Sequence, residues 1–267
     1  MSSKVFEGTT VLITGASSGI GEAFAHNLAK RSANLILTAR SADKLVRVAD
    51  ELREKHRISV HVFPVDLTLP DAPRQLFERI KASGLSVDVL INNAGFGKWA
   101  HFLGENLDTY EQMLSLNINA LVRLTYLCVP DMLARGKGGV INVASTAAFQ
   151  PTPYIAVYSA SKSFVLNFTE ALAGEYRERG IHFLALCPGF TDTNFNSIAN
   201  VNTAGIRFAT PDEVAEAGLK AFVKDKSYHV HGCANYLTSL LPRILSRATV
   251  IGIVANMFKN RVRPWPA

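Results

Sequence analysis

Short apolar runs alternate with longer segments of helical periodicity along most of the chain. The apolar runs lie at residues 10–14, 35–39, 58–66, 87–93, 139–145 and 181–187. The segments between them have the length and apolar spacing of helices, at residues 19–33, 41–56, 71–83, 106–133 and 154–179. Continuous apolar strands that alternate with helices are typical of a parallel sheet buried on both faces. The pattern therefore predicts a Rossmann-like, doubly wound α/β fold with helices on both faces of the sheet.

This alternation ends after Gly189. An irregular stretch reaches about residue 210, and the sequence TPDE then opens a helix. A short strand is predicted at 227–231, where His229 and His231 are interpreted as strand residues, and helical sequence continues to the end. Because no linker, repeat or low-complexity tract divides the chain, we predict one domain over 1–267. Its core covers about 8–232, and a helical, basic C-terminal extension covers about 233–267.

Composition narrows the class of protein. Of the 267 residues, 48% are apolar and 19% are charged, which is a globular composition. The first residues lack the apolar run of a secretory signal, and no stretch approaches the ~20 apolar residues of a membrane span. Cys128, Cys187 and Cys233 have neither metal-site nor disulfide spacing. We therefore expect no metal site and a reducing, cytoplasmic environment, with peripheral membrane association as an alternative.

A glycine-rich turn follows the first predicted strand. The sequence TGASSGIG contains Gly15, Gly19 and Gly21, with Ser17, Ser18 and Ile20 between them. Glycines at the first strand-to-helix turn let the backbone approach a pyrophosphate, which rests on the helix N-terminus. The spacing differs from the usual G-x-G-x-x-G fingerprint, so the position of the turn in the fold carries the argument. The sequence predicts a dinucleotide site.

The end of the second predicted strand indicates which dinucleotide binds. A site for NAD(H) places an acidic residue there to hold the ribose 2′-hydroxyl. This chain has Ala39 followed by Arg40, with Lys44 one turn further on. A guanidinium suits a 2′-phosphate, so we predict NADP(H) as the cofactor.

Tyr158 and Lys162 are four residues apart on a predicted helix and therefore share a face. Such a pair alone is more often a surface contact. The dinucleotide turn and Ser145, at the end of a predicted strand, favour a chemical role instead. A cation beside Tyr158 would lower the tyrosine pKa from about 10, so that Tyr158 acts as general acid and base. Ser145 would hydrogen-bond the substrate oxygen, and the predicted reaction interconverts a ketone or aldehyde and an alcohol.

With these motifs in order, residues 8–195 resemble the short-chain dehydrogenases/reductases. The resemblance implies that Asn117, Ser145, Tyr158 and Lys162 are catalytic and that Asn117 helps to hold a water that relays protons to Lys162. It also implies that Lys162 binds the nicotinamide ribose and that Asp66 contacts the adenine. The other cofactor-binding residues that it implies are Asn93, Ala94, Gly95, Tyr158, Pro188, Gly189, Thr191 and Thr193. The chain departs from the family at its C-terminal extension, which affects the expected oligomeric state and substrate.

The loops that follow Gly95, Ser145 and Gly189 are rich in aromatic residues, namely Phe96, Trp99, Phe102, Phe149, Phe190 and Phe195. We expect Ser145, Phe96, Phe149, Phe190 and Phe195 to bind the substrate. An aromatic lining favours a small apolar carbonyl or alcohol substrate, such as a lipid, steroid or acyl group. Two alternatives remain open. One is a non-catalytic NADP(H)-binding sensor or scaffold, and the other is a 3-oxoacyl- or steroid-specific reductase with a membrane-associated C-terminus.

The extension has apolar residues at helical spacing, at Leu237, Leu240, Leu241, Ile244 and Leu245. We interpret them as a packed helix face, and a second short helix can use Val250, Val254, Met257 and Phe258. The basic residues are Arg243, Arg247, Lys259, Arg261 and Arg263, and no nucleic-acid motif accompanies them. We expect no nucleic-acid partner. For the extension, the preferred hypothesis is packing beside the substrate cleft, then oligomer contact, then peripheral membrane contact. We expect the protein to be a homo-oligomer, a dimer in preference to a tetramer.

Overall fold

Seven parallel strands form one twisted sheet in the computed structural model, which describes residues 5–262. The strands are β1 (Thr10–Thr14), β2 (Asn34–Ala39), β3 (Val60–Pro64), β4 (Val89–Asn92), β5 (Gly138–Val143), β6 (Ile181–Cys187) and β7 (Tyr228–Val230). Their order across the sheet is β3-β2-β1-β4-β5-β6-β7, with every pair parallel. The chain reverses its direction of winding between β1 and β4. A doubly wound sheet binds its ligands outside the carboxyl ends of the strands at that point.

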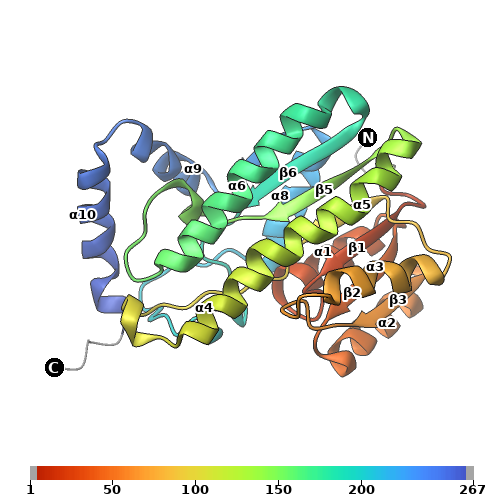
Figure 1. Cartoon of the computed structure of the whole chain (residues 1–267), viewed down its shortest axis with the longest axis horizontal. Coiled ribbons are helices and arrows are strands. Elements are labelled where there is room, and N and C mark those ends of the chain that lie inside the picture. The colour runs from red at the N-terminus through yellow and green to blue at the C-terminus, as the bar shows by residue number, and fades with distance from the viewer. Residues whose placement is uncertain (1–4, 263–267) are drawn as a thin grey trace.

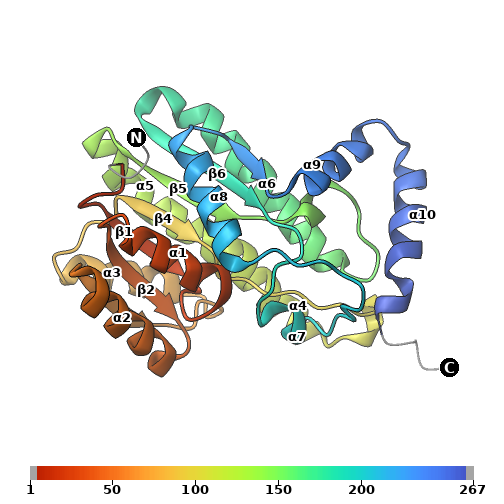
Figure 2. The ribbon, with the colours of Figure 1, turned by 180° about the vertical axis from the view of Figure 1, so that it is seen from behind.

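Helices cover both faces of the sheet (Figures 1 and 2). On one face lie α1 (Gly19–Ala29), α2 (Ala42–His56) and α8 (Pro211–Val223). On the other lie α3 (Ala72–Ala82), α4 (Leu107–Leu114), α5 (Leu121–Arg135) and α6 (Ala156–Tyr176). Two apolar clusters result, one between the sheet and α1, α2 and α8, and the other between the sheet and α3 and α5. The predicted doubly wound α/β fold is confirmed.

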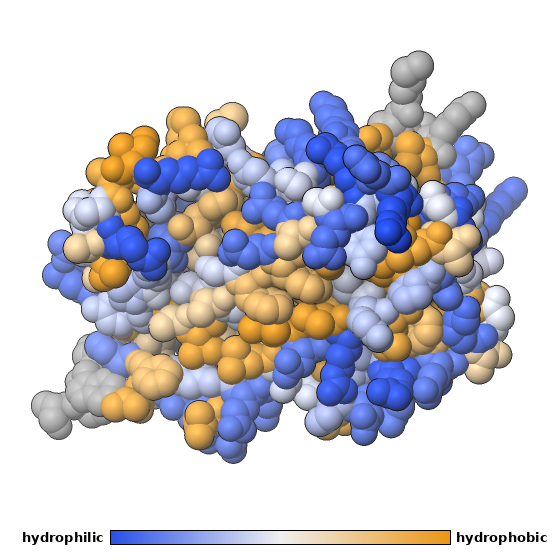
Figure 3. Space-filling view, turned by 45° about the horizontal axis from the view of Figure 1, so that its top comes forward, coloured by the Kyte–Doolittle hydropathy of each residue, from blue (hydrophilic) through white to orange (hydrophobic). Residues whose placement is uncertain are grey.

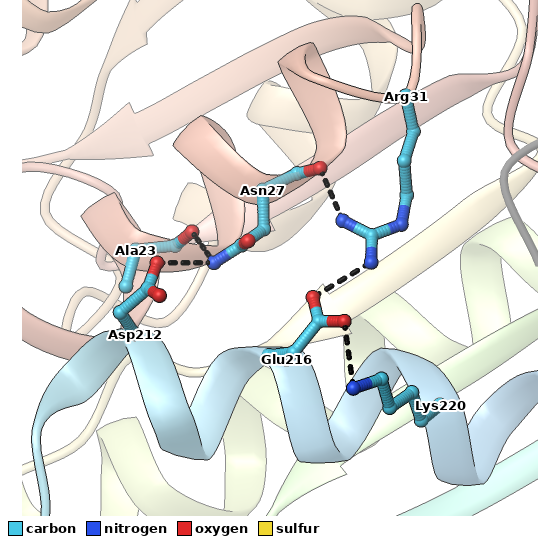
Figure 4. Close-up of polar contacts among 6 residues, drawn as sticks. All are labelled: Ala23, Asn27, Arg31, Asp212, Glu216 and Lys220. Carbon is cyan, nitrogen blue, oxygen red and sulfur yellow. Dashed lines mark hydrogen bonds and ion pairs between the residues drawn. The ribbon is translucent and has the colours of Figure 1, made fainter.

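Polar contacts fix α8 against α1 (Figure 4). The Asn27 Nδ2 atom donates a hydrogen bond of 2.7 Å to Asp212, and the Arg31 guanidinium donates one of 2.6 Å to Glu216. Asp212 and Glu216 lie four residues apart and therefore on the same side of α8. Helix α8 begins with a capping box in which Thr210 and Glu213 exchange hydrogen bonds. These contacts hold the start of α8 after the irregular stretch that follows β6.

The long helix predicted at 106–133 is interrupted in its middle. A π-helix, η2 (Ser115–Ala120), separates α4 from α5, and its wider turn was not predicted from the sequence. The continuous helical stretch Leu107–Arg135 is also the one stretch among the described residues that is long and apolar enough to cross a membrane. It packs on the sheet and carries Asn117, so it is a core helix of the fold.

The C-terminal arm, defined as residues 233–262, projects from the sheet beyond β7 and then turns back (Figures 1 and 2). It contains α9 (Cys233–Leu240), η5 (Leu241–Arg243), α10 (Arg247–Phe258) and η6 (Lys259–Arg261), so the predicted helical extension is present. We predicted that the apolar residues from Leu237 to Leu245 form a packed helix face, and this prediction is wrong. Leu237, Leu241 and Ile244 are exposed, and Leu240 and Leu245 are only half-buried. Arg263 lies outside the described residues.

The remaining short helices lie in connections. They are η1 (Phe102–Gly104) before α4, η3 (Thr146–Phe149) after β5, η4 (Arg177–Arg179) after α6 and α7 (Phe195–Ile198) after β6. Three of them, η1, η3 and α7, follow the carboxyl ends of strands β4, β5 and β6. They therefore lie at the edge of the sheet where the predicted site residues also lie.

Candidate active site

The glycine-rich turn brings the backbone between β1 and α1 close to the end of β4. Gly15 has a φ of +66°, and a Cβ added there would lie 2.8 Å from the Asn93 Nδ2 atom. A Cβ at Gly21 would lie 2.3 Å from the Gly15 carbonyl oxygen, so only glycine fits at either position. Ser18 precedes α1 without capping it through its side chain, which leaves the first N–H groups of the helix available. The turn therefore fits the pyrophosphate of a dinucleotide.

The segment after β4 is bonded to β1. The Asn93 side chain donates a hydrogen bond of 2.9 Å to the Thr14 carbonyl oxygen, and the backbone N–H groups of Asn93 and Ala94 both donate to the Thr14 hydroxyl. Gly95 follows directly, and a Cβ there would lie 2.9 Å from the Asn117 Oδ1 atom. These contacts join the two strands at the point where the winding reverses.

Basic side chains lie at the end of β2. Arg40 and Lys44 are exposed and line the same cavity as the glycine-rich turn. Asp66 lies nearby on the loop after β3, where its carboxylate accepts hydrogen bonds from the backbone and hydroxyl of Thr68. Among the described residues that line this cavity, Asp66 is the one acid. A phosphate group would meet two cations at the end of β2 and no carboxylate on that strand.

Asn117 lies in the π-helix and is buried behind the cavity. Its Oδ1 atom accepts a hydrogen bond of 3.1 Å from the Phe96 N–H, and its Nδ2 atom donates bonds of 3.0 Å to the Phe96 carbonyl oxygen and 3.1 Å to the Ser161 hydroxyl. Ser161 in turn donates to the Tyr158 carbonyl oxygen over 2.7 Å. The amide therefore joins the loop after β4 to helix α6.

Ser145, Tyr158 and Lys162 converge on one wall of the cavity. Tyr158 and Lys162 lie one turn apart on α6, and the Lys162 Nζ atom lies 5.7 Å from the centre of the Tyr158 ring. The same Nζ atom is buried and donates a hydrogen bond of 2.7 Å to the Val143 carbonyl oxygen on β5. Ser145, just after β5, hydrogen-bonds the Tyr158 side chain. The arrangement places a hydroxyl, a phenol and an amine around the same space.

Burial is the main cause of the pKa shifts of Tyr158 and Lys162. It raises the pKa of Tyr158 to about 12, while the hydrogen bond with Ser145 acts in the opposite direction. It lowers the pKa of Lys162 from 10.5 to about 8. The sequence had predicted a lowered tyrosine pKa, and this direction is wrong for the structure. The Lys162 ammonium lies over the ring and bonds to Val143, and burial removes the water that would stabilise the phenolate.

One cavity of about 470 Å³ contains most of the predicted site residues. The predicted catalytic residues that line it are Ser145, Tyr158 and Lys162. The predicted cofactor residues that line it are Gly15, Ser17, Ser18, Gly19, Ile20, Arg40, Lys44, Asp66, Asn93, Ala94, Gly95, Pro188, Gly189, Thr191 and Thr193. The loop after β6 approaches the glycine-rich turn directly, since a Cβ at Gly19 would lie 2.9 Å from the Thr193 side chain. The structure thus gathers residues from the carboxyl ends of six strands, β1 to β6.

Some predicted residues lie elsewhere. Phe149 packs against Tyr228 in a cluster beside β6 and β7, with ring centres 6.2 Å apart, and is not brought to the cavity. Phe102 stacks on Tyr110 and is exposed. Gly21 and Asn117 support the cavity from behind rather than lining it. Phe149 is the last residue of η3, and its ring packs beside β6 and β7 instead of in the cavity.

The aromatic end of the cavity includes a residue that sequence reasoning did not assign to the site. Phe258, from α10, lines the cavity and meets Trp99 edge to face, with ring centres 4.6 Å apart. Phe190 and Phe195 pack in the same cluster as Trp99 and Phe258, and Phe96 and Ile198 also line the cavity. The preferred hypothesis for the extension, packing beside the cleft, therefore holds for the end of the arm. No local pattern around Phe258 distinguishes it from its apolar neighbours, so only the long-range contact identifies it.

Comparisons with known proteins agree with this geometry. The sequence profile of the short chain dehydrogenase family matches residues 9–204. The chain is 32% identical to the very-long-chain 3-oxoacyl-CoA reductase of Rattus norvegicus, over 95% of this chain and 82% of that protein. It is 33% identical to the 17-beta-hydroxysteroid dehydrogenase type 3 of Mus musculus, over 80% of this chain and 68% of that protein.

A solved structure has the same fold. A short-chain dehydrogenase from Sphingobium yanoikuyae, in complex with NADPH, superposes with a TM-score of 0.80 at 31% identity, and the match covers 88% of this chain and 93% of that one. The family profile covers the strands from β1 to β6 and every residue of the Ser145, Tyr158 and Lys162 group. The chain belongs to the short chain dehydrogenase family.

Proposed function

We propose that this protein is an NADP(H)-dependent oxidoreductase that interconverts a ketone or aldehyde and an alcohol on an apolar substrate. The observation that carries the proposal is the convergence of Ser145, Tyr158 and Lys162 on a cavity that also contains the glycine-rich turn. A dinucleotide held by that turn and a substrate beside Tyr158 would share one cavity. Hydride and proton transfer to the same carbonyl group require this proximity.

The cofactor assignment rests on Arg40 and Lys44. Their positive charges at the end of β2 suit the 2′-phosphate of NADP(H), and the relative from Sphingobium yanoikuyae was solved with NADPH. When bound, NADPH supplies the hydride that reduces the carbonyl carbon. Gly15, Gly19 and the start of α1 would hold the pyrophosphate.

The proton reaches the carbonyl oxygen from Tyr158. The phenol is protonated at neutral pH both at its ordinary pKa near 10 and at the pKa of about 12 to which burial raises it, so Tyr158 is present as a proton donor for reduction. Ser145 donates a hydrogen bond to the same oxygen as negative charge develops on it. Lys162 has a pKa lowered to about 8, so it exchanges protons near neutral pH and returns a proton to the tyrosinate. In the oxidative direction Tyr158 accepts the proton of the alcohol.

The substrate proposal rests on the apolar end of the cavity. Trp99, Ile155 and Val262 form a buried cluster there, against which Tyr158, Phe190 and Phe258 pack. An apolar carbonyl compound would bury its surface on these side chains. The names of the relatives, a very-long-chain 3-oxoacyl-CoA reductase and a hydroxysteroid dehydrogenase, favour acyl or steroid ketones among such compounds.

The proposal also covers catalytic activity as against cofactor sensing, the cellular location and the oligomeric state. The alternative of a non-catalytic NADP(H) sensor requires the loss of a reacting group, and the presence of Ser145, Tyr158 and Lys162 argues against it. A cytoplasmic location is proposed from the three unpaired cysteines. A homodimer is proposed as the oligomeric state, and the mass in solution measures it.

The proposed function is tested with Tyr158→Phe. Consumption of NADPH is followed with a 3-oxoacyl thioester, a steroid ketone and a ketose sugar. We expect turnover of an apolar ketone to fall by roughly 10²-fold or more, the scale of a general acid, with NADPH affinity retained. Tyr176→Phe is the matched control at the other end of α6 and should keep full turnover. Normal turnover in Tyr158→Phe, or wild-type activity on the sugar alone, would contradict the proposal.

A further inference from the structure

The C-terminal arm carries several large apolar side chains that are exposed to solvent. Leu237 is 65% exposed, Ile244 is 80% exposed and Met257 is 56% exposed. Leu241, Ile251 and Ile253 are exposed as well, so both helices of the arm present apolar side chains to solvent. Single exposed apolar residues are ordinary, whereas a run of them along two consecutive helices marks an interaction surface.

The arm holds this surface in a fixed position. Val250 is buried, and Phe258 and Val262 belong to the aromatic cluster at the end of the cavity. The Arg261 side chain donates a hydrogen bond of 2.8 Å to the Asn202 carbonyl oxygen, and the Asn202 N–H donates one of 3.2 Å to the Arg261 carbonyl oxygen. The arm is therefore attached at both ends, at β7 and at the cavity, while its outer face has no partner among the described residues.

The charge of the arm indicates what covers that face. Arg243, Arg247, Lys259 and Arg261 lie in the arm, and residues 227–262 contain no Asp or Glu. Figure 3 shows hydrophilic and hydrophobic side chains next to each other at the left edge of the molecule, where the arm lies. Two copies of an acid-free, basic face would repel each other across an isologous contact. An anionic surface that also accepts apolar side chains fits both properties, and an anionic lipid bilayer has both.

Geometry favours contact along the bilayer surface rather than across it. Helix α10 has 12 residues, which gives a length of about 18 Å, against a hydrocarbon thickness of about 30 Å. The segment with exposed Phe102, Leu103 and Leu107 lies beside the lower end of α10 in both ribbon views (Figures 1 and 2). Glu105 and Asp108 lie in or next to that segment and are acidic. The positive charge of the surface is therefore supplied by the basic residues of the arm.

We propose that the exposed face of residues 233–262, with the apolar side chains of 102–107 beside it, docks on an anionic lipid bilayer. Phe258 and Ile198 line the cavity at this end of the molecule, so the apolar end of the cavity lies next to the docked surface. An apolar substrate dissolved in the bilayer would then reach the cavity without crossing water. This second step rests on the proposed function, whereas the docking itself does not.

The test uses the full chain and vesicles of phosphatidylcholine, with or without 30 mol% phosphatidylserine, in a sedimentation assay. We expect at least tenfold tighter binding to the anionic vesicles in 0.1 M salt and loss of this preference in 0.5 M salt. The double variant Ile244→Glu/Ile253→Glu should bind at least tenfold more weakly. Val46→Glu, at an exposed apolar position on α2, is the matched control and should bind like the wild type.

Charge is tested separately. Arg247→Gln should weaken binding to anionic vesicles about fivefold, and Arg74→Gln, an exposed arginine on α3, should change it by less than twofold. NADPH affinity, measured for every variant, verifies the fold. Absence of vesicle binding in 0.1 M salt, or binding that the double variant leaves unchanged, would overturn the proposal. A solution mass that the double variant halves, without vesicle binding by the wild type, would assign the face to a second copy instead. Because no turnover is measured, docking and the proposed function can fail independently.

Discussion

A substitution at Asn117 tests whether this side chain positions the loop after β4 against helix α6. Its amide makes three hydrogen bonds, two to the backbone of Phe96 and one to the Ser161 hydroxyl, and the side chain is buried. Asn117→Ala removes all three bonds and leaves the Phe96 N–H and carbonyl groups without these partners. The loop after β4 and helix α6 then lose their direct connection through the π-helix.

The size of the effect follows from these contacts. A typical buried hydrogen bond contributes about 1 kcal/mol, so three bonds predict a loss of about 3 kcal/mol in the free energy of unfolding. For a chain of this size that loss lowers the midpoint of thermal unfolding by about 6–12 °C. Because Ser161 also bonds to the Tyr158 carbonyl oxygen, we expect turnover to fall as well. NADPH affinity should fall less than turnover, since Asn117 does not line the cavity.

Urea unfolding, thermal unfolding and steady-state kinetics measure these quantities. The matched control is Asn167→Ala on the outer side of α6, where the amide donates one exposed hydrogen bond to the Ser163 carbonyl oxygen. That change should alter stability by no more than about 0.5 kcal/mol. A loss below about 1 kcal/mol in Asn117→Ala would show that its hydrogen bonds do not hold the loop against α6, and the reasoning would fail.

Three further predictions follow from the same geometry. Arg40→Ala should weaken NADPH binding about tenfold or more and leave NADH binding unchanged, because only the 2′-phosphate contact is lost; equal losses in fluorescence titrations would contradict this. Phe258→Ala should raise kcat/KM for long acyl ketones relative to short ones by about tenfold, whereas Ile251→Ala should not; an unchanged ratio would remove Phe258 from the cavity wall. Lys162 has a folded pKa of about 8 and an unfolded pKa of 10.5, so its contribution to stability rises with pH across that window. Urea unfolding at pH 7.5 and 9.5 should reveal this rise, and Lys162→Met should lack it.

Local patterns in the sequence were sufficient for the order of the main strands and helices and for the residues that we predict at the site. Strands recur as apolar runs and helices as periodic ones, because both depend on neighbours within a few residues. The residues at strand ends, such as Ser145 and Gly15, could be assigned to one edge of the sheet because parallel strands share their direction. Tyr158 and Lys162 could be paired because four residues make about one helical turn.

Only the tertiary structure decided the remaining features. Asn117, in the π-helix at Ser115–Ala120, is hydrogen-bonded to Phe96 and Ser161, which lie 21 and 44 residues away in the chain. The raised pKa of Tyr158 depends on burial by several elements, and a sequence read locally cannot sum that desolvation. Phe258 reaches Trp99 although the two residues are far apart in the chain, while Phe149, close to Ser145, turns away. Periodicity specifies which residues share a face, but contacts between distant segments determine what that face meets.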